Sequence, residues 1–480
     1  MILDAIFAAA AASPGKDAVI FNGRAWSFGA FAAAIEAGAD HLVGRGVGGH
    51  GVGILAVDDI LDAWIWGFAL RRLGLTTVIA RSVDEIAALD LTDVRCLLVP
   101  AANPRPDLAS LCARQDWPLI AMERQMTLSA RPRGDAPARP PGGHILQTSG
   151  TTGAAKKVLI DPSQEALLVA RRQTVYGIGR DTVAAYPEFG GWTGVGYKSA
   201  VAVWAVGGTV VIDQGRAAHL ALAEPRLTHT ELIPIMLASI LAAPADAIAF
   251  NPGLQMVVTG APITEALARE ARSRVTPRLL TAIGATEVSV FACTPLTSSE
   301  DRRWHRPVAD AEVQIVDEDD RPLSPGGLGR LRVSAADGPG AYLGDPAASA
   351  EFFRHGFFYP GDLAVMRQDG RFALHGRVTD VVNILGQKLA PAPIEDALRE
   401  ALGVTGVCLF SMQDDNAEEQ AHLAIETDTP VDQGVLAGVL GRYLPGLASA
   451  HVHHVRALPR NSMGKVQRLA LQVLLRGAAR

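Results

Sequence analysis

The segment Thr148-Ser-Gly-Thr-Thr-Gly-Ala-Ala-Lys-Lys157 places four hydroxyl side chains, two glycines and two adjacent lysines within one short stretch, directly after the apolar run 144–147. Only six of the chain's 44 basic residues are lysines, and two of the six stand here. Glycine lets the backbone approach a ligand and expose its N–H groups, hydroxyls add hydrogen-bond donors, and lysine adds a compact positive charge. Together these properties are typical of a phosphate-binding loop, although a polar surface turn can have a similar composition.

The spacing of this segment excludes a Walker A loop, which requires Gly-x-x-x-x-Gly-Lys followed by serine or threonine. The segment resembles the phosphate loop of the adenylate-forming (AMP-binding) superfamily, which includes acyl- and aryl-CoA ligases, luciferase and the adenylation domains of peptide synthetases. That family's loop reads Thr-Ser-Gly-Thr-Thr-Gly-x-Pro-Lys-Gly, and here Ala155 replaces the proline and Lys157 the final glycine. The resemblance implies that Lys156 is a catalytic residue. It also implies that the phosphates of ATP are held by Thr148, Ser149, Gly150, Thr151, Thr152 and Gly153.

Composition narrows the possible functions. The 480 residues carry a net charge of -6 and contain no basic run, which argues against a nucleic-acid partner. A hydrophobic content of 49% with 20% charged residues is ordinary for a soluble enzyme. Charged residues interrupt the most apolar stretches, so no membrane span is predicted. The four cysteines lack metal-ligand spacing, which is typical of reduced thiols and predicts a cytoplasmic protein.

Helical and strand-like stretches alternate in the first part of the chain. Residues 31–42 and 60–73 have helical spacing, whereas 52–57 and 77–80 read as short strands. This alternation predicts an α/β core in which helices connect parallel strands. A Gly-x-Gly-x-x-Gly pattern at 44–49 follows a helix and precedes a strand, the reverse of a Rossmann turn, so we do not assign it dinucleotide binding.

The family resemblance extends over essentially the whole chain, as far as Arg468. It implies an α/β protein with a large multi-sheet N-terminal domain, residues 1–376. A small, mobile α+β lid domain, residues 377–480, would follow it.

A second motif, Ile283-Gly-Ala-Thr-Glu287, is weak alone but lies where the resemblance expects it. In the family, the residue at Glu287 helps to hold Mg²⁺ against the ATP phosphates, and the residue at Thr286 touches the α-phosphate. A carboxylate suits that hard cation. Ile283 and Gly284 stand where the family places an aromatic ring and its neighbour against adenine. The segment that lines the adenine pocket in relatives is matched by Gly260, Ala261 and Pro262.

A third motif runs from Tyr359-Pro-Gly-Asp362 to Gly376-Arg377. In relatives the aspartate at Asp362 accepts hydrogen bonds from the ribose hydroxyls, and the arginine at Arg377 reaches the ribose or a phosphate. An ionised acceptor strengthens such bonds. Thr379 occupies the family's hinge position, which is commonly an aspartate. Threonine can serve there, because a hinge need only absorb a backbone rotation.

The segment Leu458-Pro-Arg-Asn-Ser-Met-Gly-Lys465 matches the end of the family's sequences. The resemblance implies that Lys465 bridges the substrate carboxylate and the α-phosphate, where a cation lowers the barrier to attack. A surface lysine is the alternative, but the order of the motifs along the chain argues against coincidence. In a strand over these residues, His451 and His453 lie on the same face. No third metal ligand is evident beside them, so a solvated strand face is favoured over a metal site.

The acyl pocket of relatives begins in the segment Tyr186–Gly196, which provides Phe189, Gly190, Trp192 and Gly194. Amino-acid-activating relatives carry an aspartate after the phenylalanine, whereas Gly190 stands here. An unpaired ammonium group in a dry pocket is costly, so an α-amino acid substrate is disfavoured. The glycines indicate space and Trp192 an aromatic wall, which predicts an aryl or medium-length acyl carboxylate. Trp192 could equally be a core residue.

The implied reaction consumes ATP with Mg²⁺, joins a small carboxylic acid to AMP with release of pyrophosphate, and transfers the acyl group to a thiol. CoA is the leading acceptor, and a carrier-protein phosphopantetheine is the alternative. A non-catalytic nucleotide-binding paralogue is a third possibility, motivated by the departures at Ile283, Thr379 and Pro393.

Overall fold

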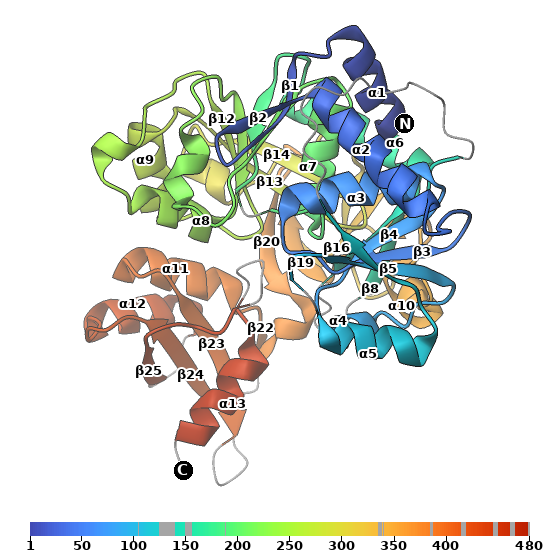
Figure 1. Ribbon diagram of the computed structural model, residues 1–480. Coiled ribbons are helices and arrows are strands. Elements are labelled where there is room, and N and C mark those ends of the chain that lie inside the picture. Colours follow the sequence, from blue (N-terminus) through green and yellow to red (C-terminus); the bar gives the residue numbers. More distant parts are fainter. Residues whose placement is uncertain are drawn as a thin grey trace.

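The computed structural model describes residues 1–103, 105–123, 140–148, 156–187, 189–334, 338, 340–384, 387–413, 419–444, 450–460 and 466–478. Two mixed sheets, one antiparallel sheet and smaller C-terminal sheets carry its strands (Figure 1). The C-terminal elements, orange to red in Figure 1, lie together on one side of the molecule. Within the described ranges, no helix is both long and apolar enough to cross a membrane.

The largest sheet has eight strands in the order β14-β13-β12-β11-β9-β10-β1-β2. Its inner pairs are parallel, and only the two outermost pairs are antiparallel. Its strands are β1 (Asp17–Phe21), β2 (Arg24–Ser27), β9 (Val183–Ala185), β10 (Thr209–Ile212), β11 (His229–Leu232), β12 (Gln255–Thr259), β13 (Arg278–Ala285) and β14 (Ser289–Pro295).

The second sheet has six strands in the order β6-β5-β3-β4-β7-β8 and is parallel except for the final pair. That pair brackets the predicted phosphate loop. The strands are β3 (Val52–Leu55), β4 (Thr76–Ile79), β5 (Val94–Pro100), β6 (Leu119–Met122), β7 (His144–Thr148) and β8 (Lys156–Ile160).

The third sheet is antiparallel and carries the Asp362 motif. Its strands are β15 (Val313–Val316), β16 (Leu328–Ser334), β17 (Phe353–Arg354), β18 (Phe357–Phe358), β19 (Asp362–Met366) and β20 (Phe372–Arg377). A 3₁₀ turn follows at Val378–Asp380. The C-terminal strands are β21 (Val382–Ile384), β22 (Gln387–Leu389), β23 (Val407–Gln413), β24 (Glu419–Glu426) and β25 (His451–Val455).

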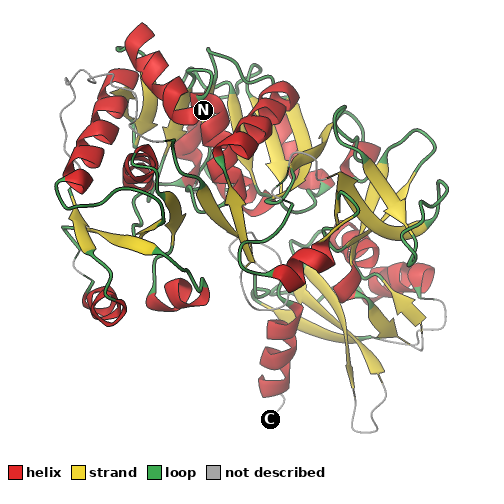
Figure 2. Cartoon of the chain, turned by 90° about the vertical axis from the view of Figure 1, so that its right-hand side faces the viewer, coloured by secondary structure: helices red, strands yellow, loops and turns green. Residues whose placement is uncertain are grey.

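The α-helices pack on these sheets, as Figure 2 shows. They are α1 (Ile2–Ala12), α2 (Phe28–Val43), α3 (Ile60–Arg72), α4 (Val83–Ala88), α5 (Pro106–Gln115), α6 (Pro162–Tyr176), α7 (Gly194–Trp204), α8 (Pro234–Leu241), α9 (Glu265–Arg274), α10 (Pro346–Phe352), α11 (Ala392–Leu402), α12 (Gln433–Tyr443) and α13 (Arg468–Ala478). The helices predicted over 31–42 and 60–73 are confirmed as α2 and α3, and the two predicted strands as β3 and β4.

The main core joins both large sheets through helices α2, α3, α6 and α7. Trp204 of α7 is fully buried and packs its ring against Phe31 and Trp64. Helix α6 begins with a capping box, in which Asp161 accepts from the backbone of Gln164 and the Gln164 side chain accepts from the backbone of Asp161. The capping box defines the start of α6, and the Trp204 contacts hold α7 in the core that the two large sheets share.

The C-terminal elements have a separate apolar core that begins at Val382 and includes Ile394 and Leu423. Arg302 connects this part to the rest of the chain, because its guanidinium binds Glu265 of α9 at 2.9 Å and Glu400 of α11 at 3.2 Å. The predicted α/β architecture, a large multi-sheet N-terminal part and a smaller C-terminal part, is confirmed. The boundary at residue 376 stays a prediction.

Candidate nucleotide and acyl site

The predicted adenine-pocket segments lie side by side at the ends of two parallel strands. Thr259, the last residue of β12, pairs in register with Ala282 of β13 and donates its hydroxyl to the Ala282 carbonyl at 3.0 Å. The exposed residues beyond these positions are Gly260, Ala261, Pro262 and Gly284, with Ile283 partly exposed. Ligands of open α/β sheets bind outside the carboxyl ends of parallel strands. The predicted adenine-pocket residues therefore lie at the edge of the sheet where a ligand can bind.

Glu287 is buried, with 6% of its surface exposed, and it accepts a hydrogen bond from Tyr342. The distance from Tyr342 Oη to Glu287 Oε1 is 2.7 Å. Burial, together with the neighbouring carboxylate, raises the pKa of Tyr342 above its ordinary value, so the phenol remains a proton donor. The sequence analysis missed Tyr342. Its only signal was a large aromatic residue in a glycine-rich and proline-rich stretch.

Lys156 also lies next to Tyr342, over its aromatic ring. Its Nζ is 5.6 Å from the centroid of the Tyr342 ring and 4.0 Å from that of Phe352. Cations are attracted to the faces of aromatic rings at such distances. The lysine after the phosphate loop and the predicted magnesium ligand Glu287 therefore share Tyr342 as a neighbour.

The strands β7 and β8 flank the predicted phosphate loop, and Thr148 pairs with Lys156 across their antiparallel ladder. Lys157 is directed elsewhere, and its Nζ donates to the carbonyls of Leu89 and Asp90 after helix α4. The predicted phosphate-binding residues Ser149, Gly150, Thr151, Thr152 and Gly153 lie outside the described residues, as does Ala155.

Asp362 and Arg377 stand opposite each other at the ends of β19 and β20. Arg377 Nε lies 3.0 Å from Asp362 Oδ1, and the same guanidinium donates to the carbonyl of Pro360. The two residues predicted to contact the ribose are thus brought together, as an ion pair. Their roles toward a nucleotide remain predictions.

The acyl segment is more closely packed than its glycines suggested. A Cβ placed on Gly190 would overlap the ring of Trp192, so the indole fills the space that this glycine was expected to open. A Cβ on Gly194 would lie 2.8 Å from the Thr286 hydroxyl. The partly buried Trp192 packs against two core clusters and also lies beneath the Arg81 guanidinium, 4.8 Å from its ring centroid. Phe189 is buried.

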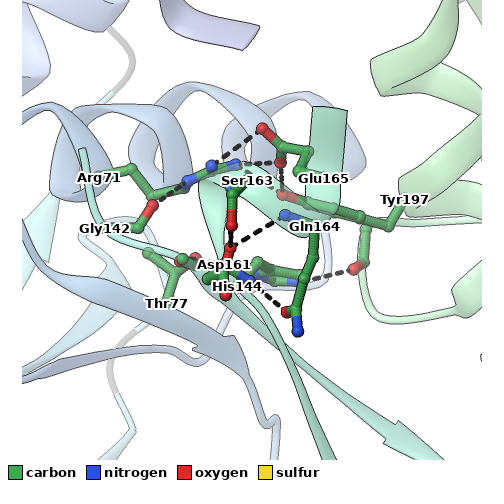
Figure 3. Close-up of polar contacts among 11 residues, drawn as sticks. Arg71, Thr77, Gly142, His144, Asp161, Ser163, Gln164, Glu165 and Tyr197 are labelled. Atoms are coloured by element: carbon green, nitrogen blue, oxygen red, sulfur yellow. Dashed lines mark hydrogen bonds and ion pairs between the residues drawn. The ribbon is translucent and has the colours of Figure 1, made fainter. Parts of the chain in front are cut away.

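A buried polar network joins this segment to the phosphate-loop strand (Figure 3). His144, the first residue of β7, contacts the Gly191 carbonyl with Nε2 at 2.9 Å and the Thr77 hydroxyl with Nδ1 at 2.8 Å. Because a carbonyl can only accept, Nε2 carries the proton. Complete burial lowers the pKa of His144 to about 3, so the ring stays neutral. The ring stacks on Tyr197, with centroids 4.3 Å apart.

Tyr197 connects this histidine to a buried ion pair between α3 and α6. Arg71 binds Glu165 through two N–H groups at 2.8 and 3.1 Å and also donates to the Tyr197 hydroxyl at 2.5 Å. A cavity of about 10 Å³, about the size of one water molecule, adjoins Arg71, His144 and Gly191. The network fixes the acyl segment relative to β7. It was missed because His144 reads as one residue of an apolar run.

The C-terminal motif has only its flanks among the described residues. Lys465 lies outside them. Beyond it, Arg468 binds Asp380 and Glu395, both at 2.6 Å. Thr379, the predicted hinge, lies in the 3₁₀ turn that contains Asp380. The turn and the C-terminal motif are therefore linked through Arg468.

Glu395, in the first turn of α11, is buried and also accepts from the Leu409 amide at 2.8 Å. His422 of β24 joins His451 and His453, since its Nδ1 lies 2.9 Å from His453 Nε2 and its ring stacks on His451. Even so, no group of three His, Cys, Asp or Glu residues within the described part of the chain could hold a metal ion.

Comparisons with known proteins agree with this geometry. A family model described as AMP-binding enzyme matches residues 6–342, and the chain belongs to this adenylate-forming family. Novobiocin biosynthesis protein H of Streptomyces niveus is 26% identical over 495 aligned positions, which cover 95% of this chain and 80% of that protein. Indoleacetate–CoA ligase of Aromatoleum aromaticum is 27% identical over 341 positions, which cover 68% of this chain and 65% of that ligase.

Among solved structures, o-succinylbenzoate CoA synthetase of Bacillus subtilis, in complex with its acyl-adenylate intermediate, matches with a TM-score of 0.83. The match covers 98% of this chain and 97% of that chain at 19% identity, a level at which it speaks for the fold. The family predicted from the motifs is confirmed. The relatives include CoA ligases, in agreement with the predicted class of AMP-forming ligases.

Proposed function

We propose that this protein uses ATP to convert a carboxylic acid to acyl-AMP, with release of pyrophosphate, and then transfers the acyl group to a thiol. The observation that carries the proposal is the grouping of Lys156, Tyr342 and Glu287. Glu287 lies two residues beyond the end of β13, in a chain of the AMP-binding family.

In the first half-reaction, the phosphate loop and Thr286 would hold the ATP phosphates. Mg²⁺ is bound in proteins by carboxylate oxygens, and the buried carboxylate of Glu287 fits that requirement. Bound there, the ion would offset negative charge on the phosphates. Lys465 would sit between the substrate carboxylate and the α-phosphate. The carboxylate oxygen attacks the α-phosphorus, the bond to pyrophosphate breaks, and acyl-AMP results.

In the second half-reaction, a thiol attacks the acyl carbonyl and AMP leaves, so one difficult acyl transfer becomes two easier steps. We propose CoA as the thiol, with a carrier-protein phosphopantetheine as the alternative. The lid comprises residues 377–480 and turns about Thr379, and residues 1–376 form the nucleotide-binding domain. All four cysteines are free thiols, which supports the proposed cytoplasmic location.

We propose an aryl or medium-length acyl carboxylate as the substrate. The support is Trp192, which places a partly buried aromatic ring beside Gly190 in the acyl segment. Gly190 offers no carboxylate to an ammonium group, and an unpaired buried charge is costly, which argues against an α-amino acid.

Two of the three departures that motivated a non-catalytic paralogue, Pro393 and Thr379, fit the structure without strain. Pro393 lies in the first turn of α11, where a missing N–H costs no helical hydrogen bond. Thr379 lies in a short 3₁₀ turn, where its side chain disturbs no strand. These positions give no support to a loss of catalysis.

Acid-dependent exchange of pyrophosphate into ATP tests the first half-reaction across a panel of aryl, acyl and amino acids. We expect exchange with at least one aryl or acyl carboxylate and none with Lys465→Ala. No exchange with any acid would favour the non-catalytic paralogue. For the acid that works, mass spectrometry after addition of CoA or of a phosphopantetheinylated carrier identifies the acceptor.

A further inference from the structure

Helix α7 connects the acyl segment to the Thr286–Glu287 turn. Its N-cap residue Thr193 directly follows Trp192 and accepts a hydrogen bond from the Gly196 amide at 3.0 Å. Gly194 and Lys198 are four residues apart, so they lie on the same face of the helix. Both contact the turn: Gly194 lies against the Thr286 hydroxyl, and Lys198 reaches the backbone.

Lys198 binds the turn through two carbonyl groups. Its Nζ donates to the Thr286 carbonyl at 2.6 Å and to the Ala285 carbonyl at 3.2 Å. The side chain is buried, and this residue is one of only six lysines in the chain. Burial lowers the pKa of Lys198 to about 7, with a further decrease from Arg172 and an opposing effect of Glu287 and Glu231. A buried ammonium group needs such partners, because an unsatisfied one is costly.

The residues on both sides of Lys198 hold α7 in place. Tyr197 is bonded to Arg71 and Glu165. Ser199 accepts from Arg172 at 2.6 Å and donates to Glu231 at 2.8 Å. The helix is thereby fixed against α3, α6 and β11. A lysine on so rigid a support can set the position of whatever it binds.

We propose that Lys198 is a positioning residue for the adenylation step, which holds the Ala285–Thr286 backbone so that Thr286 and Glu287 face the phosphates and metal of the nucleotide. The inference rests on the proposed function and deepens it. Since α7 starts at the acyl segment, the same helix sets the acid pocket and the nucleotide turn relative to each other. A lysine that only satisfies buried carbonyls, without effect on the reaction, is the alternative.

Lys198→Met tests this role, because methionine keeps most of the apolar stem and removes the ammonium group. Lys16→Met is the matched control: Lys16 also donates to a backbone carbonyl, that of Arg180, but lies outside the proposed site. We expect kcat for pyrophosphate exchange to fall about 100-fold in Lys198→Met, as for a catalytic group displaced by about 1 Å. Transfer of a supplied acyl-adenylate to the thiol should change by less than about threefold. Lys16→Met should match the wild type in both assays. Equal loss of both half-reactions, or no loss of adenylation, would overturn the proposal.

A second measurement is independent of turnover. Calorimetric titration with ATP, with and without Mg²⁺, should show that Lys198→Met loses most of the gain in affinity that the metal provides. Metal-free binding, to which Thr286 contributes but Glu287 does not, should weaken much less. Equal weakening under both conditions would contradict a role through Glu287. If the wild type activates no acid, the proposed function fails, and this titration still decides the role of Lys198.

If Lys198→Met does not fold, Gly194→Ala displaces the same turn from the same helix face, because its methyl group would lie 2.8 Å from the Thr286 hydroxyl. The same separation of the two half-reactions is expected. An unchanged adenylation rate in a folded Gly194→Ala would count against the coupling through α7.

Discussion

Replacement of Glu165 by leucine should strongly destabilise the N-terminal part of the protein. Glu165 and Arg71 are both almost fully buried and form a two-point ion pair at 2.8 and 3.1 Å. Arg71 further donates to the Gly142 carbonyl at 2.7 Å. The substitution leaves the guanidinium buried without its counter-ion, with only the Tyr197 hydroxyl and one carbonyl as partners.

The magnitude follows from two opposing terms. At 2.8 Å and an effective dielectric constant of about 20, the attraction between the charges is about 6 kcal/mol. The desolvation penalty is several kcal/mol for each ion, so the intact pair contributes little net stability. Loss of one partner leaves the penalty of the other, and Glu165→Leu should lower the free energy of unfolding by about 3–5 kcal/mol.

The triple variant Arg71→Met/Glu165→Leu/Tyr197→Phe removes the whole polar group and should be far more stable than the single one. It leaves chiefly the Gly142 carbonyl without a donor, which costs about 1–3 kcal/mol. We therefore expect the free energy of unfolding of the triple variant to lie within about 3 kcal/mol of the wild-type value, despite the three substitutions. Asp319→Asn, at the exposed pair with Arg321, is the control and should cost less than about 1 kcal/mol.

Urea unfolding followed by tryptophan fluorescence measures these differences. All tryptophans lie between residues 26 and 304, so the signal reports on the N-terminal part of the chain. Midpoints are converted to free energies with the wild-type slope. The reasoning is refuted if Glu165→Leu costs less than about 1 kcal/mol, or if the triple variant is as unstable as the single one.

Further predictions concern catalysis, hinge motion, packing and pH. Lys465→Ala should lower adenylation by several orders of magnitude yet still transfer a supplied acyl-adenylate to thiol; parallel assays of the two half-reactions check this, and equal losses contradict it. Thr379→Pro should spare pyrophosphate exchange but slow thioester formation, and an unchanged thioester rate would place the hinge elsewhere. Gly190→Ala should force the Trp192 ring to move and change KM for the acid more than KM for ATP, which steady-state kinetics would reveal. Burial, together with the neighbouring histidines, lowers the pKa of His422 to about 4. Because the fold favours the neutral ring, stability is lost as pH falls from about 6.5 through 4, and faster amide exchange in β24 over that range measures it.

The sequence predicted the features that depend on local pattern. Helix α3 and strand β4 were predicted because apolar residues repeat with clear periods over their length. The family resemblance, and not the short motifs alone, pointed to Glu287 and Asp362, and their roles stay predictions. In the structure Lys156 and Glu287 share a neighbour, as a common nucleotide site requires.

Features that depend on tertiary packing could not be predicted. Tyr342 contacts Glu287 across a separation of 55 residues in the chain, and no local pattern relates them. The sequence could not show whether Gly190 leaves space for a substrate, because the space of a missing Cβ can be filled by a ligand or by a neighbouring side chain. Here the Trp192 ring takes that space.

Lys198 shows why a residue that interrupts a pattern can carry a function. In the sequence, Lys198 is only a charged residue that interrupts an apolar helix. In the structure, successive residues of that helix point about 100° apart. Tyr197, Lys198 and Ser199 therefore reach three different groups of partners: the Arg71 pair, the Thr286 turn and the Arg172 pair. A shift of α7 would disturb all three at once. An acid that displaces the Trp192 segment at the start of this helix would then also move the turn that we propose to face the nucleotide. In such an arrangement, a poorly fitting acid slows adenylation through the backbone as well as through its own contacts.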